Sequence, residues 1–228
     1  MTMLHETFVS GGHTVPLSVF LPVPSHKCPA VLILHGSFGL LPAYRADIIS
    51  FANALVSAGF AAVMPHYLDA TTPVTLPGEG VLKLIPQLRP AWRQACSDAL
   101  ATMAQDSRLD ANRLGVLGFS LGGNLALSLA MDPPAGTRIK CVVDFFGPTQ
   151  WLEGHWSKLP PILICHGADD LLVVPGQSDF LVAQLEKAGR KSGAGYEFQS
   201  YPGQGHGFKE PALTKSRDAA VDFVKRTL

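Results

Sequence analysis

The hexapeptide GFSLGG at residues 118–123 constrains this 228-residue chain more than any other stretch. It follows an apolar run at residues 114–117 and leads into another at 124–130, which predicts a strand, a sharp turn and a helix. Ser120 stands at the apex, and glycines two positions away on either side remove Cβ atoms that would collide there. The pattern is that of a G-x-S-x-G nucleophile elbow, although a glycine-rich turn without chemistry has the same local sequence.

Composition narrows the class of protein. Hydrophobic residues make up 47% of the chain and charged residues 16%, which favours a large core and argues against disorder. Basic and acidic residues number 18 each, so no overall charge attracts nucleic acid or an anionic membrane. The N-terminus lacks a secretion-signal pattern, and no apolar run approaches the roughly 20 residues that span a bilayer. We therefore expect a cytoplasmic protein with no nucleic-acid or membrane partner.

Predicted strands and helices alternate from residue 30 onward, without a linker or an internal repeat. Continuous apolar runs such as 30–34 are typical of strands buried on both faces, and hence of a parallel sheet covered by helices. Strands are predicted at 6–9, 15–21, 30–34, 60–64, 113–117, 139–146, 161–165 and 196–201, and helices at 44–58, 92–105, 121–131, 177–187 and 211–225. We predict one α/β domain over residues 1–228, with a mainly parallel central sheet flanked by helices on both faces.

Residues 65–90 depart from this alternation. They include five prolines and show no convincing periodicity, so we predict a loop. A loop this long in a compact domain usually has a function, such as covering a site, but an excursion that contains a short helix is an equal alternative.

Three chemically active residue types follow strands of the predicted sheet, where ligands of such sheets bind. Ser120 follows one strand, Asp169 and Asp170 follow another, and His206 follows the last. The order Ser, Asp, His is expected when the nucleophile stands on the elbow of an α/β-hydrolase sheet. His206 would take the proton of Ser120, and an ionised aspartate would orient the imidazole. Alternatively, the aspartate pair could cap the helix predicted at 177–187.

An acyl-transfer site also needs two hydrogen-bond donors for the oxyanion of its tetrahedral intermediate. The backbone N–H of Leu121, directly after the nucleophile, is the first. The loop after the strand at 30–34 should supply the second, for which Ser37 is the first choice and Phe38 the alternative. We expect the flanking glycines, Gly36 among them, to let this loop fold over the elbow.

Two further histidines stand in His-Gly pairs at strand ends. We expect His35 and His166 to have structural roles rather than to act as second bases. The eight histidines and four cysteines show no metal-ligand spacing, so we expect no metal and no cofactor.

Taken together, these motifs resemble the dienelactone hydrolase family of the α/β-hydrolase superfamily, over most of the chain from residue 30 onward. The resemblance rests on four segments: HGSFGL at 35–40, GFSLGG at 118–123, HGADD at 166–170 with a following Val-Pro, and YPGQGHGF at 201–208. The resemblance implies that the triad acid is Asp170 rather than Asp169. It likewise implies that the N–H of Ser37 is the second oxyanion donor.

The sequence departs from this family's pattern in two respects. Dienelactone hydrolase itself has a cysteine at the elbow and a glutamate in the oxyanion loop, where this chain has Ser120 and Gly36. The family's enzyme also holds its substrate carboxylate with arginines, one of them shortly after the histidine, where this chain has Lys209 and Glu210. The resemblance therefore implies the fold and the triad, but not the dienelactone substrate.

We expect a serine hydrolase that cleaves a small carboxylic ester or lactone through an acyl-Ser120 intermediate. Acyl transfer, thioester hydrolysis or peptide hydrolysis by the same triad stays open, and so does a non-catalytic binding protein on the hydrolase fold. We expect a monomer or a homodimer.

Overall fold

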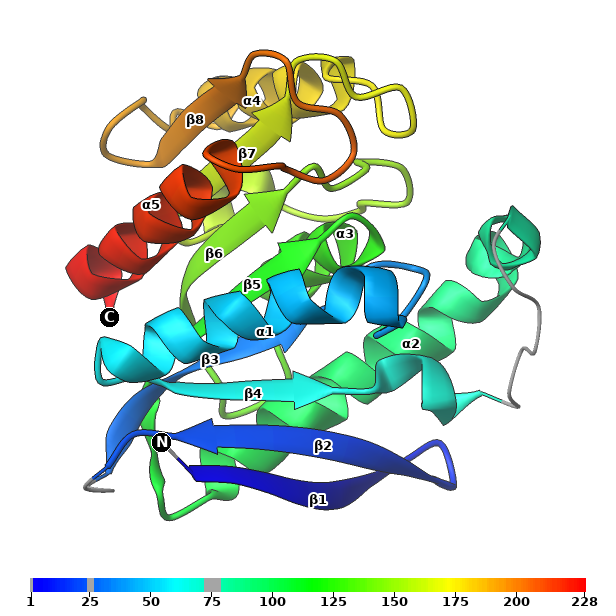
Figure 1. Ribbon diagram of the computed structural model, residues 1–228, viewed down its shortest axis with the longest axis vertical. Helices are drawn as coiled ribbons and strands as arrows, with labels where there is room; N and C mark the ends of the chain where they lie inside the picture. The colour runs from blue at the N-terminus through cyan, green and yellow to red at the C-terminus, as the bar shows by residue number, and fades with distance from the viewer. Residues whose placement is uncertain (1, 24–26, 72–78) are drawn as a thin grey trace.

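The computed structural model describes residues 2–23, 27–71 and 79–228, and its strands form one eight-stranded sheet (Figure 1). The strand order is β1-β2-β4-β3-β5-β6-β7-β8. β2 pairs antiparallel with β1 and β4, and all other neighbours are parallel. The strands are β1 (Thr2–Ser10), β2 (His13–Leu21), β3 (Cys28–Leu34), β4 (Ala61–Pro65), β5 (Leu109–Phe119), β6 (Ile139–Phe145), β7 (Ile162–Gly167) and β8 (Tyr196–Tyr201).

Five α-helices in the described part of the chain cover the two faces of this sheet. They are α1 (Pro42–Ser57), α2 (Glu79–Gln105), α3 (Leu121–Met131), α4 (Gly176–Lys187) and α5 (Ala212–Thr227), with short 3-10 helices at Tyr67–Ala70 and Trp156–Lys158. Figure 1 shows α1 and α5 in front of the sheet and α2 and α3 behind it. The α/β-hydrolase fold predicted from the sequence is confirmed.

The alternation of side chains along β3 explains why both faces are covered. Leu32 and Leu34 pack into the core cluster that includes residues of α2, α3 and α4, whereas Val31 and Ile33 pack into the cluster with α1 and α5. All four side chains are fully buried. A strand with two apolar faces is stable only between two helical layers, as its continuous apolar run predicted.

The prediction of a loop at 65–90 was wrong over its second half. Residues 72–78 lie outside the described residues, but α2 begins at Glu79 and continues through Pro86 and Pro90. A proline inside a helix typically costs about 3 kcal/mol, because it removes a backbone hydrogen bond and crowds the preceding turn. Both prolines are exposed, while Ile85 and Trp92 on the other side of α2 are buried in the core. This buried face holds the helix together, and the prolines concealed its periodicity.

The site is positioned by the carboxyl ends of the parallel strands. Phe119 at the end of β5 lies in register with Phe145 at the end of β6. Gly167 at the end of β7 likewise lies in register with Tyr201 at the end of β8. The segments that follow these four strands, and the one that follows β3, therefore leave the sheet at one edge.

Candidate active site

The elbow between β5 and α3 holds Ser120 in a strained backbone conformation. Its φ is 55° and its ψ is −119°, a region that residues with a Cβ rarely adopt. The Ser120 N–H donates to the Phe145 carbonyl at 2.9 Å, and the Ser120 carbonyl accepts the Asn124 N–H at 3.1 Å. A Cβ on Gly122 would collide with the carbonyl of Leu34. Sheet and helix thus approach too closely here for any residue larger than glycine.

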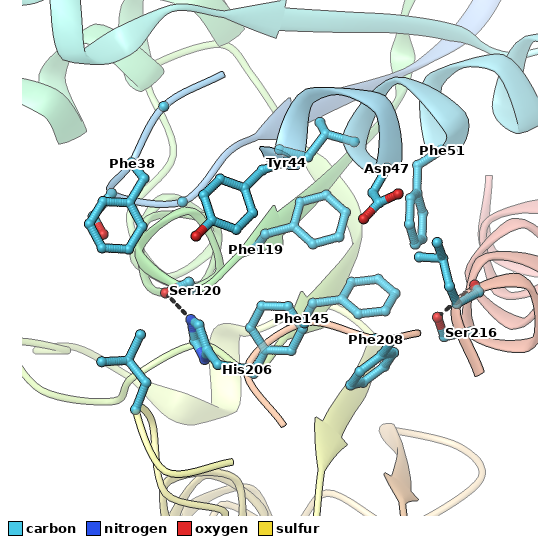
Figure 2. Close-up of a pocket in the computed structure, with 18 residues that line it drawn as sticks. Phe38, Tyr44, Asp47, Phe51, Phe119, Ser120, Phe145, His206, Phe208 and Ser216 are labelled. Carbon is cyan, nitrogen blue, oxygen red and sulfur yellow. Dashed lines mark hydrogen bonds between the residues drawn. The ribbon is translucent and has the colours of Figure 1, made fainter. Parts of the chain in front are cut away.

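Ser120, His206 and Asp170 are joined by two hydrogen bonds. The Oγ atom of Ser120 lies 2.9 Å from Nε2 of His206, 86 residues further along the chain (Figure 2). The Nδ1 atom of His206 lies 2.8 Å from Oδ2 of Asp170. Asp169 is exposed, and no side chain caps α4, so the structure does not support the capping alternative. The three side chains are placed so that a proton can pass from the hydroxyl to the imidazole while the carboxylate fixes the ring.

Asp170 is a fully buried carboxylate with four nitrogen atoms around it. Its Oδ1 accepts the backbone N–H groups of Leu172 and Val173, each at 2.9 Å. Its Oδ2 faces His206 and also lies 3.4 Å from Nε2 of His166. Burial alone would raise the pKa of Asp170, but the hydrogen bonds from both histidines and from Val173 hold that pKa well below its ordinary value. The carboxylate therefore stays ionised throughout the neutral pH range.

His166 is itself fixed from both ring nitrogens. Its Nε2 lies 2.8 Å from the Val173 carbonyl, so this nitrogen carries a proton, and its Nδ1 lies 2.6 Å from the Ser178 hydroxyl. Burial lowers its pKa, but the hydrogen bonds to Asp170 and to the Val173 carbonyl outweigh burial, so the pKa is raised overall. The structural role expected for His166 fits these contacts, and the structure adds a contact with Asp170.

His35 anchors the loop after β3. Its Nδ1–H donates to the Gly36 carbonyl at 2.9 Å, and its ring stacks on Tyr67 at a centroid distance of 4.3 Å. The Tyr67 hydroxyl in turn donates to the His35 carbonyl at 2.7 Å. Burial lowers the pKa of His35 to about 4, so the ring is neutral at pH 7. His35 is therefore placed to hold the loop rather than to act as a base.

The candidate oxyanion donors lie on two segments, the start of α3 and the turn after β3. Leu121 is the first residue of α3, where the backbone N–H has no acceptor within the helix. Ser37 and Phe38 occupy the centre of a turn closed by the Gly39 N–H and the Gly36 carbonyl at 3.0 Å, and both line a cavity beside Ser120. That Ser37 rather than Phe38 supplies the second donor stays a prediction.

Gly36 itself is not required for the fit of this turn. A Cβ at this position would meet Ser120 Cβ at an ordinary 3.5 Å. Gly39, by contrast, has a φ of 64° and needs the freedom of glycine. Of the two glycines expected to let this loop fold, Gly39 therefore needs to be glycine, whereas position 36 has room for a Cβ.

A cavity of about 190 Å³ lies beside Ser120 and His206, and seven of the 18 residues that line it are Phe or Tyr (Figure 2). Phe119, Phe145 and Phe51 form one cluster, with ring centroids 5.0–5.1 Å apart. Phe146 lies 4.7 Å from the His206 ring. These aromatic residues were not predicted from the sequence. The strand-end rule that predicts Ser120 and His206 nevertheless applies also to residues 145 and 146 at the end of β6.

The described residues hold no candidate metal site and no candidate membrane-spanning helix. Across residues 2–23, 27–71 and 79–228, no group of three or more His, Cys, Asp or Glu side chains is arranged to hold a metal ion. Within the same described ranges, no helix has the length and apolar character that crossing a membrane requires.

A mostly parallel sheet that carries a serine on a strand-to-helix elbow defines the class of α/β-hydrolases. Residues 17–227 match the dienelactone hydrolase family, and the chain belongs to that family. The chain is 32% identical over 163 residues to "Hydrolase LUC6" of Fusarium sp. The matched region covers 68% of this chain but only 35% of that protein.

Another relative matches over most of its own length. A protein of Bradyrhizobium sp named "Probable 2-oxo-3-(5-oxofuran-2-ylidene)propanoate lactonase" is 28% identical over 207 residues, 83% of this chain and 77% of the relative. Among solved structures, a dienelactone hydrolase-like promiscuous phosphotriesterase from metagenomic libraries has a TM-score of 0.81 at 18% identity, over 99% of this chain and 98% of that one. At that identity, the likeness shows the fold alone.

Proposed function

We propose that this protein is a serine hydrolase that cleaves a small carboxylic ester or lactone through an acyl-Ser120 intermediate. The observation that carries the proposal is the continuous hydrogen bonding from Ser120 through His206 to Asp170. Family membership and the lactonase name of the Bradyrhizobium relative support an ester or lactone as the substrate. Since the matched region is only about a third of LUC6, the activity of the whole protein is part of this proposal.

The first half-reaction forms the acyl-enzyme. Ser120 Oγ attacks the carbonyl carbon while its proton passes to Nε2 of His206. Negative charge then develops on the former carbonyl oxygen, where the N–H groups of Leu121 and Ser37 would stabilise it. The C–O bond to the leaving group breaks, and His206 returns the proton to the departing oxygen, which in a lactone stays tethered to the acyl group.

The second half-reaction releases the acid. His206 takes a proton from water, the resulting hydroxide attacks the acyl carbon, and the bond to Ser120 Oγ breaks as that oxygen regains a proton. Asp170 stays ionised throughout and stabilises the imidazolium. No further reactant is needed besides water.

Loss of activity in Ser120→Ala tests this mechanism. We expect the purified protein to hydrolyse p-nitrophenyl butyrate, Ser120→Ala to lose at least about 10³-fold in kcat/KM, and Ser107→Ala, at an exposed turn, to match the wild type. Mass spectrometry after treatment with a fluorophosphonate should place the label on Ser120. Full turnover by Ser120→Ala would rule the mechanism out, and a protein that neither turns over esters nor takes the label would favour the binding-protein interpretation.

A location in the cytoplasm and a monomeric or homodimeric state also stay predictions. Sedimentation of the purified protein would test the oligomeric state.

A further inference from the structure

The described wall of the cavity beside Ser120 has one acidic side chain and no lysine or arginine. Asp47 on α1 lines it together with Ile48 and Phe51, which lie on the same face of that helix. Besides Asp47, the only titratable groups on the described wall are Tyr44 and His206, and no lysine or arginine is among the described residues that line it.

Asp47 and the nucleophile lie toward opposite sides of the group of side chains that lines the cavity. Figure 2 shows Ser120 and His206 at one end of the drawn group and Asp47 with Ser216 at the other. Phe119 and Phe145 lie between the two ends. A group attached to the scissile carbonyl would therefore extend over aromatic rings before it meets the carboxylate of Asp47.

The aromatic rings and the Asp47 carboxylate of the cavity wall favour different properties of a substrate. Phenylalanine rings favour an alkyl chain or an aromatic ring, because the contact removes apolar surface from water. A substrate that bears a distal carboxylate would instead bring a second negative charge toward Asp47, with no basic side chain on the described wall to offset it. Asp47 is exposed, so water screens this repulsion and keeps it moderate.

We propose that this cavity takes the acyl group of the substrate, that the acyl group is apolar and carries no negative charge at its far end, and that Asp47 discriminates against acyl groups with a distal carboxylate. The inference rests on the proposed function. The acyl group is the part that stays bound to Ser120 through both half-reactions, whereas the alcohol of a simple ester departs after the first. A partly enclosed apolar cavity is therefore most useful to the acyl group.

Three p-nitrophenyl esters with matched acyl chains test the proposal at low ionic strength and pH 7. They are the hexanoate, the adipate monoester with its free carboxylate, and the 6-(trimethylammonio)hexanoate. We expect the wild type to prefer the hexanoate to the adipate by about tenfold in kcat/KM, and to accept the cationic ester at least as well as the adipate. A second series varies chain length. We expect kcat/KM to differ more between p-nitrophenyl butyrate and octanoate, which vary the acyl chain, than between methyl and hexyl butyrate, which vary the alcohol chain.

Substitution of Asp47 should change the ratio between these esters. Asp47→Asn should bring the hexanoate-to-adipate ratio to within about threefold, and Asp47→Lys should invert the preference. Asp218→Lys makes the same change of charge at an exposed position of α5 that does not line the cavity, and it should keep the wild-type ratio.

Each contrary result has a distinct meaning. Equal hydrolysis of hexanoate and adipate by a protein that depends on Ser120 would overturn this inference and leave the proposed function standing. If Asp47→Lys and Asp218→Lys change the hexanoate-to-adipate ratio equally, the overall charge of the protein causes the preference, and the role proposed for Asp47 is overturned. A stronger effect of the alcohol chain would overturn the assignment of the cavity to the acyl group. Absence of any Ser120-dependent ester hydrolysis would overturn the proposed function, and this inference with it.

Discussion

His166 Nε2 lies 3.4 Å from Asp170 Oδ2, the same oxygen that faces His206 Nδ1 at 2.8 Å. Two imidazoles therefore share one buried carboxylate oxygen. Val173 and Ser178 fix the ring of His166, so it cannot turn away from Asp170 without breaking other hydrogen bonds. We therefore predict that His166 acts on the proposed reaction through Asp170, as a positioning residue.

Loss of the His166 imidazole should weaken catalysis at pH 7 and weaken it further at acidic pH. His166→Leu removes a donor that lowers the pKa of Asp170, so that pKa should rise and the carboxylate should become protonated at a higher pH. We expect kcat to fall about tenfold at pH 7, and the acid limb of the kcat profile to move to higher pH. The measurement is kcat for an ester between pH 4.5 and 8.

The control is His166→Gln, whose amide N–H can still donate to Asp170 or to the Val173 carbonyl. It should restore most of the activity and the acid limb of the wild type. An unchanged pH profile in a folded His166→Leu variant would contradict the positioning role, because a purely structural loss lowers activity without moving the profile.

Ser120→Gly should stabilise the protein while it removes the nucleophile. The positive φ of Ser120 typically costs about 1–3 kcal/mol, and glycine adopts such a φ with little strain. For a chain of this size, each kcal/mol corresponds to about 2–4 °C in Tm. Calorimetry should therefore give a higher Tm for Ser120→Gly than for Ser120→Ala, which keeps the Cβ. A lower Tm for the glycine variant would show that the elbow is not strained.

The parts of the fold that the sequence predicts well depend on local sequence features. The elbow needs glycines at fixed offsets from Ser120, and the predicted bounds of α3 and β8 match the observed ones. The buried face of α2 could not be recognised so easily, because Arg89 interrupts its apolar spacing and two prolines lie within it. Packing against the sheet stabilises α2 despite its prolines, and such packing is not visible in a local sequence pattern.

The aromatic wall of the cavity was missed for a different reason. Phe51 and Phe119 come from distant parts of the chain, and each alone is an ordinary core residue in an apolar run. Only the three-dimensional arrangement shows that both line a space beside Ser120. The reaction type can therefore be predicted from this sequence, whereas substrate preference needs the fold.

Two glycines near the nucleophile should differ sharply in their tolerance of alanine. A Cβ on Gly36 meets Ser120 Cβ at 3.5 Å, an ordinary contact, so Gly36→Ala should change stability by less than about 1 kcal/mol. A Cβ on Gly122 would overlap the Leu34 carbonyl, so Gly122→Ala should lose several kcal/mol or fail to fold. Chemical denaturation of both variants checks this, and equal losses would contradict it.

Asp144 on β6 should make the protein less stable as the pH rises toward neutrality. Its carboxyl is fully buried, and burial raises its pKa to about 7 even though nearby His166 and the Gly147 N–H favour the ionised form. The unfolded chain releases this proton near its ordinary pKa of 3.8, whereas the native protein holds it to about pH 7. Unfolding therefore releases a proton in this range, and higher pH favours unfolding.

Asp144→Asn removes this linkage. Its stability relative to the wild type should increase between pH 4 and 7 by an amount on the order of 4 kcal/mol, at 1.36 kcal/mol per pKa unit, and level off above pH 7. Denaturant midpoints at several pH values give the measurement, with Asp179→Asn at an exposed position of α4 as the control. A difference between Asp144→Asn and the wild type that stays constant from pH 4 to 8 would mean that Asp144 ionises in the native protein at its ordinary pKa.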